Sequence, residues 1–138
     1  MGDVKWVGNI NGSMNAPTLL FTNSSAGTLE EGDVCFFTSG ELTKGTDDLA
    51  TVAVVCLDDA VASATNVPCI PIAGGNIFRA DYVFGDNGCL PGVLCGIAVT
   101  SNKFEIESTG SHKTVLCIAT DTDAGTADFI AKPTTPWV

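Results

Sequence analysis

The six cysteines are the residues of this sequence that are best suited to covalent or metal chemistry. Four of them stand singly inside apolar runs, namely Cys35, Cys56, Cys95 and Cys117. An even number of cysteines can form a disulfide framework, whereas a free cysteine behaves as a small buried hydrophobe. The sequence does not open with a charged segment followed by an apolar one, so we expect synthesis in a reducing compartment. We therefore favour core thiols over disulfides, and expect Cys89, which lies in a turn, to be the most accessible.

The sequence contains few residues that could bind a metal ion or act as a general acid or base. Zinc sites use closely spaced Cys and His ligands, yet there is no Cys-x2-Cys pair and His112 is the only histidine. The acidic pairs Asp47-Asp48, Asp58-Asp59 and Asp121 with Asp123 lack the further ligands of a calcium loop, so we interpret them as solvated turn residues. One Arg, one Tyr and no nucleophile or phosphate-binding motif leave little for catalysis. We expect no enzymatic activity, no metal and no cofactor.

The elements that carry these residues are predicted to be strands. Val, Ile and Thr number 37, and these β-branched residues favour sheets over helices. Residues 103–108 and 77–82 alternate apolar and polar side chains, which is typical of half-buried strands. Residues 51–57 are apolar throughout and predict a central strand covered on both faces. Residues 67–73 carry Pro68 and Pro71 and predict an edge or bulged strand.

Further strands are expected at residues 34–39, 93–100, 113–120 and 126–131, and a short helical turn is possible at residues 58–64. Glycine-containing turns separate these segments. The prediction is an all-β fold, a small β-barrel or β-sandwich of about eight short strands.

The charge of the chain restricts its partners. Sixteen acidic residues against six basic ones give a net charge of −10, and the mean hydropathy is +0.30. A chain of this charge does not neutralise phosphates, so nucleic acid is excluded as a partner. The longest apolar run, residues 52–57, is far shorter than the roughly 20 residues of a membrane-spanning helix. Only 16% of the residues are charged, which indicates that other copies or a larger partner cover much of the surface.

The two ends differ from the middle of the chain. Residues 1–28 are polar with isolated apolar side chains and predict an extended N-terminal arm, residues 29–131 the β domain, and residues 132–138 an irregular C-terminal tail. A tryptophan near each end either folds back onto the chain's own core or anchors a neighbouring molecule. The second interpretation gives these candidate capsid or subunit interface residues: Lys5, Trp6, Val7, Ile10, Leu19, Leu20, Phe21, Pro136, Trp137 and Val138.

The order of several segments is similar to that in a known family. The segments are GTLEEGDVCFF (27–37), GELTKGT (40–46), VAVVCLDDA (52–60), GNIFRADY (75–82) and GVLCGIAV (92–99), followed by Phe104-Glu105-Ile106. The order is a glycine-led strand, a short glycine turn, a strand that begins with valine and alanine and ends in aspartate and alanine, and a later glycine-x-x-phenylalanine strand. This order resembles that in the small head decoration (cement) proteins of tailed bacteriophages. The long polar N-terminal segment and the six cysteines depart from the small members of that family.

The resemblance implies a structural virion protein, made in the host cytoplasm, that binds the outer capsid surface and stabilises the lattice of the major capsid protein. It also implies a homo-oligomer, with a trimer favoured. Two alternatives stay open. One is another virion component, such as a head fibre, a tail protein or a receptor- or glycan-binding β module. The other is a secreted or periplasmic disulfide-bonded domain or enzyme.

Overall fold

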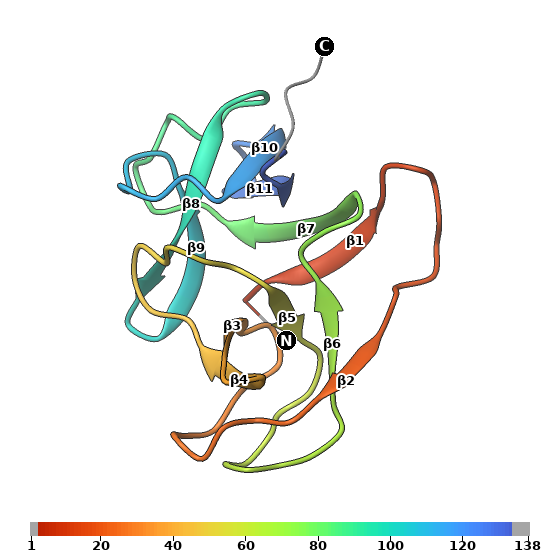
Figure 1. The fold of residues 1–138 in the computed structure, drawn as a ribbon. Helices are drawn as coiled ribbons and strands as arrows, with labels where there is room; N and C mark the ends of the chain where they lie inside the picture. The colour runs from red at the N-terminus through yellow and green to blue at the C-terminus, as the bar shows by residue number, and fades with distance from the viewer. Residues whose placement is uncertain (1–2, 134–138) are drawn as a thin grey trace.

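The computed structural model describes residues 3–133, and in this range the chain forms eleven strands and no helix (Figure 1). The strands are β1 (Lys5–Asn9), β2 (Leu19–Phe21), β3 (Val34–Thr38), β4 (Glu41–Lys44), β5 (Val54–Cys56), β6 (Val67–Pro71), β7 (Asn76–Asp81), β8 (Leu94–Thr100), β9 (Lys103–Glu107), β10 (Val115–Asp121) and β11 (Thr126–Ala131). They make two antiparallel sheets, of order β1-β7-β11-β10-β8-β9 and β2-β6-β5-β3-β4. The part of the chain that the structure describes holds no helix long and apolar enough to cross a membrane.

The predicted all-β class is confirmed, and of the two predicted architectures the sandwich fits, because neither sheet closes into a barrel. Both sheets point side chains into the main core that lies between them. From the six-stranded sheet come Phe78 and Phe129, which pair across β7 and β11 with ring centroids 6.0 Å apart. From the five-stranded sheet come Val34, Val55 and Ile70.

The five-stranded sheet is buried on its other face too, against a second, smaller core. This second core contains Leu29, Cys35, Leu42, Val54, Cys56, Ala60, Val67 and Cys69. The loops before β3 and after β5 cover it, and Leu29 and Ala60 join these loops through two mutual backbone hydrogen bonds of 2.8 and 2.9 Å. The central strand predicted at residues 51–57 is therefore confirmed as β5, and all three of its residues are buried.

The predicted extended arm is wrong for two stretches of residues 1–28. Strand β1 pairs with β7, with Trp6 opposite Phe78, and Val4 is buried in the main core. Strand β2 pairs with β6 along its whole length. Sequence patterns missed both because each is a short edge strand, and because a bulge between Trp6 and Gly8 interrupts the alternation of β1.

Three other expectations also differ from the structure. Strand β6 is an interior strand, between β2 and β5, and it has no bulge. Its sheet tolerates Pro71 because this residue lies beyond the last residue pair with β2, where no backbone N–H is needed. Residues 58–64 form a bend, an isolated bridge at Ala60 and a tight turn closed by the hydrogen bond from the Ala64 N–H to Val61, rather than a helical turn. Strand β4 was not predicted, although Ser39 and Gly40, both with positive φ, make a tight turn that leads into it.

The predicted core thiols are confirmed. All six cysteines are free and buried. Cys89, predicted to be the most accessible, is only 1% exposed, because its thiol turns inward toward the carbonyl oxygen of Ile106 at 3.8 Å.

Candidate interaction surface

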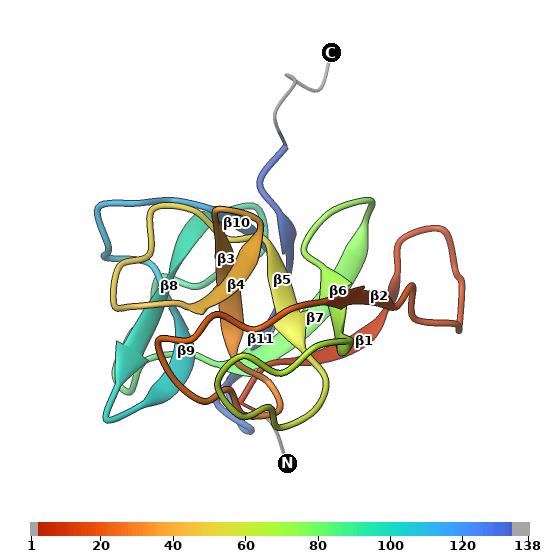
Figure 2. The same ribbon diagram turned by 60° about the horizontal axis from the view of Figure 1, so that its bottom comes forward.

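A long stretch without charged side chains forms one side of the molecule. Residues 6–29 contain no Asp, Glu, Lys or Arg, although the whole chain carries a net charge of −10. This stretch comprises most of β1, the β1–β2 loop, β2 and the loop that covers the second core. In both views the β1–β2 loop lies at the side of the molecule away from β8 and β9 (Figures 1 and 2).

Asparagine and serine side chains shape the β1–β2 loop. The side-chain oxygen of Asn9 accepts the N–H of Asn11 at 3.0 Å, and that of Asn11 accepts the N–H of Ser13 at 2.8 Å. Such local side-chain turns satisfy backbone donors where no ladder does. The loop thus gains hydrogen bonds from within itself, and its apolar side chains are left to solvent.

Four apolar side chains of residues 6–29 are strongly exposed: Ile10 (59%), Met14 (83%), Leu19 (49%) and Leu20 (59%). We call these four residues the N-terminal face. Leu19 and Leu20 lie on β2, which ends its sheet, so one side of this strand has no neighbouring strand. An exposed apolar edge strand is a surface on which other chains pair or pack. Sequence reasoning missed Met14, because a single apolar residue in a polar loop carries no periodic signal.

The predicted interface residues that the structure describes divide into two groups. Ile10, Leu19 and Leu20 are exposed, as is Lys5 at the start of β1. Trp6, Val7 and Phe21 are half-buried. Pro136, Trp137 and Val138 lie outside the described residues.

The half-buried aromatics hold the exposed group in place. Trp6 packs against the main core, and its indole N–H donates to the side-chain oxygen of Asn76 at 3.3 Å. Phe21 packs against the second core and meets Phe37 edge-on, with ring centroids 4.9 Å apart. Both residues therefore anchor the N-terminal segment to its own fold rather than standing free for a partner.

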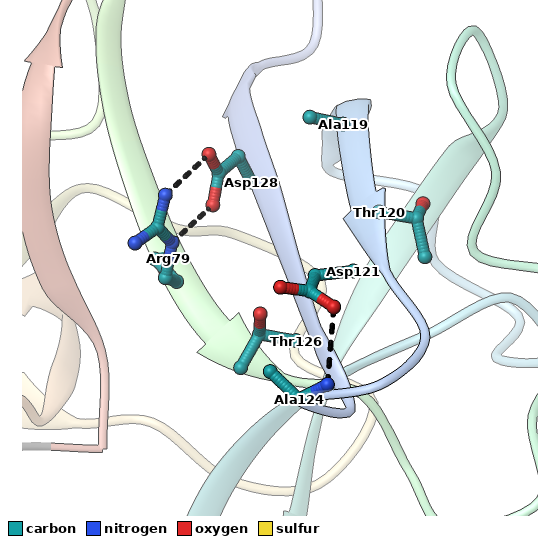
Figure 3. A pocket seen from close by; sticks show the side chains of 7 residues that line it. All are labelled: Arg79, Ala119, Thr120, Asp121, Ala124, Thr126 and Asp128. Atoms are coloured by element: carbon teal, nitrogen blue, oxygen red, sulfur yellow. Dashed lines mark hydrogen bonds and ion pairs between the residues drawn. The ribbon is translucent and has the colours of Figure 1, made fainter.

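A shallow hollow of about 380 Å³ lies on the outer face of the six-stranded sheet (Figure 3). There Arg79 on β7 makes a two-pronged ion pair with Asp128 on β11, with N–O distances of 2.7 and 3.0 Å. The pKa of Arg79 is raised by this hydrogen-bonded partner. Asp121 accepts the backbone N–H groups of Asp123 and Ala124, and the other lining residues are Ala119, Thr120 and Thr126. Because Asp128 already neutralises Arg79, the hollow offers no free cation to an anionic ligand.

A second hollow, of about 410 Å³, lies beside the fully exposed ring of Phe84. Tyr82, Glu105 and the ion pair between Lys103 and Asp81 also line it. It contains no Cys, His or Ser side chain that would serve as a nucleophile or base.

The lone histidine and the acidic pairs are placed as parts of the scaffold. The ring Nδ1 of His112 lies 3.0 Å from the carbonyl oxygen of Asp48, and its backbone N–H donates to the Asp48 carboxylate. This backbone hydrogen bond is the main cause of the lowered pKa of Asp48. Within residues 3–133, no three His, Cys, Asp or Glu side chains gather as a metal site would require.

Comparison with known proteins found no matching family model, and no curated protein or solved structure matches the chain.

Proposed function

We propose that this protein is a structural protein of a virion, which binds the outer surface of a phage capsid and stabilises the lattice of the major capsid protein. The observation that carries the proposal is the N-terminal face: four exposed apolar side chains on a stretch of 24 residues, 6–29, that has no charge. Exposed apolar side chains on and beside an unpaired edge strand are positions at which other proteins pack.

The distribution of charge supports a location on the outer surface of a capsid. All sixteen acidic residues lie outside residues 6–29. A strongly acidic protein is repelled from packaged nucleic acid and from other acidic surfaces. An uncharged face removes this repulsion locally, so the N-terminal face is the side on which a large protein surface approaches with the least electrostatic penalty.

Stabilisation of the shell follows from mass action. A protein that binds the assembled lattice, and not its disrupted form, shifts the equilibrium toward assembly. A homo-oligomer, with a trimer favoured, engages several lattice sites at once and multiplies a modest contact energy through avidity. This role requires a rigid β domain and an apolar face, and it requires no catalytic group.

The proposal is tested by co-sedimentation of the protein with expanded, undecorated capsids of a phage whose genome encodes it. We expect saturable binding and a capsid that withstands a higher temperature. The informative variant is Leu20→Glu, which places a charge on the N-terminal face at a side chain that is already 59% exposed. Burying an unpaired carboxylate is costly, so binding is expected to weaken by at least about tenfold.

Phe84→Glu is the matched control, because Phe84 is also apolar and exposed but lies on the β7–β8 loop. It is expected to leave binding unchanged, and both variants are expected to keep the melting temperature of the free protein within about 2 °C. No binding by the wild-type protein contradicts the proposed function. Binding that is lost with Phe84→Glu and kept with Leu20→Glu contradicts the assignment to the N-terminal face.

A further inference from the structure

Two of the buried thiols in the second core face one another. Cys56 on β5 and Cys69 on β6 are directly opposite in the antiparallel register, and both are fully buried. They belong to the same small core, which is closed by the Leu29–Ala60 bridge. Nothing in the proposed capsid binding uses either thiol.

The backbone geometry of this pair is suitable for a covalent bond. Leu57 donates its N–H to the carbonyl oxygen of Pro68, while the N–H of Cys56 points the other way and donates to Asp33. Cys56 and Cys69 are therefore a non-hydrogen-bonded pair, in which Cα atoms are only about 4.5 Å apart. Disulfides span Cα separations of about 4.4 to 6.8 Å, so the register places this pair within the range that a disulfide can join.

The two thiols also differ in acidity. The Cys56 thiol donates to the carbonyl oxygen of Asp58 at 2.9 Å, and the Cys69 thiol donates to that of Val67 at 3.7 Å. The neighbouring Cys69 thiol lowers the pKa of Cys56, while the Cys56 thiol and burial raise the pKa of Cys69. The thiolate is the nucleophile in thiol–disulfide exchange. Cys69 lies across the ladder in position to resolve the product.

We propose that Cys56 and Cys69 are the site of a cross-strand disulfide, which forms when the protein leaves a reducing compartment and meets a small-molecule disulfide such as oxidised glutathione. The Cys56 thiolate attacks one glutathione sulfur, giving a mixed disulfide and releasing one glutathione thiolate. The Cys69 thiolate then attacks the Cys56 sulfur and releases the second glutathione. Two protein thiols are oxidised, and one glutathione disulfide is reduced to two glutathiones.

Because both sulfurs are buried, glutathione gains access only when the covering loops open. The segment between the cysteines, residues 57–68, includes Ala60 and forms part of that cover. Loops of this kind open locally without unfolding the domain. Once formed, the disulfide fixes both ends of the segment and stabilises the second core.

A tryptic digest separates the candidate linkages. Cleavage after Lys and Arg leaves Cys56 and Cys69 together on residues 45–79, Cys89 and Cys95 on residues 80–103, and Cys35 and Cys117 on two other peptides. The native protein, purified reduced, is incubated with oxidised glutathione, then alkylated in denaturant and digested without reduction. We expect residues 45–79 to be unalkylated and two hydrogens lighter than the dithiol, while residues 80–103 carry two alkyl groups.

The oxidised protein is expected to melt on the order of 10 °C higher than the reduced protein, because a short cross-linked loop restricts the unfolded chain. Reduction with dithiothreitol should reverse the shift. Cys69→Ala should abolish it, and Cys89→Ala, at a buried thiol in the main core, should retain it. The proposal is overturned if residues 45–79 stay doubly alkylated at equilibrium, if the linkage forms between Cys89 and Cys95 instead, or if oxidation occurs only in denaturant.

Discussion

Replacing Trp6 by alanine distinguishes a strand of the fold from a free interface arm. Trp6 is half-buried against the main core, lies opposite Phe78 in the ladder and donates a hydrogen bond to Asn76. A tryptophan side chain buries about 150–250 Å² when covered. Half of that area, at about 25 cal/mol per Å², corresponds to about 2–3 kcal/mol.

The lost hydrogen bond adds less than about 1 kcal/mol, since the side-chain oxygen of Asn76 still accepts from Asn9 at 3.1 Å. We therefore expect Trp6→Ala to lower the free energy of unfolding by about 3 kcal/mol, which lowers the melting temperature of a domain of this size by roughly 10 °C.

The assay is urea unfolding followed by circular dichroism, with Leu20→Ala as the control. Leu20 is 59% exposed, so its truncation is expected to change stability by less than about 0.5 kcal/mol. If Trp6→Ala is as harmless as Leu20→Ala, then β1 does not contribute to the core and the predicted extended arm is the better description.

Two further predictions concern a buried carboxylate and a strained glycine. Asp33 is almost fully buried and pairs with Lys44 at 3.4 Å. Burial raises its pKa by more than the Glu30 N–H and Lys44 lower it, so its ionised form destabilises the fold above the folded pKa. The Asp33→Asn variant still accepts the N–H of Glu30, so it should be at least as stable as the wild-type protein at pH 7. This difference in unfolding free energy should shrink as the pH falls toward 3.8. Urea unfolding between pH 7 and 4 tests this, and a variant that is less stable than the wild type at pH 7 contradicts it. Gly75 has φ of +80°, and an added Cβ would lie 2.6 Å from Cγ1 of Ile10. Gly75→Ala should therefore cost about 1–2 kcal/mol in unfolding free energy by the same assay, and an unchanged midpoint would show that the loop relaxes freely.

The sequence predicted the strands in which apolar and polar residues alternate. It did not predict the strands that are too short or too irregular to show this alternation. Residues 103–108 and 77–82 alternate cleanly, and they became β9 and β7. Strand β2 has only three residues, and β1 contains a bulge between Trp6 and Gly8, so neither repeats long enough to be recognised.

The candidate surface was predictable only in part. Composition alone identified isolated apolar residues in the N-terminal segment, but it did not separate the exposed Ile10 and Leu20 from the half-buried Trp6 and Phe21. Whether one of these side chains is exposed or half-buried depends on which strands pair in the fold. The same holds for Cys56 and Cys69, which become neighbours only through the register of β5 with β6.

Hydrogen–deuterium exchange of the free and the capsid-bound protein tests the central claim most directly. Residues 10–18 form a loop whose amides are held mainly by local side-chain hydrogen bonds, so they are expected to exchange rapidly in the free protein. Docking through the N-terminal face predicts strongly slowed exchange in residues 10–20, with unchanged exchange in the β7–β8 loop around Phe84. Slowed exchange around Phe84 with no change in residues 10–20 would contradict the account.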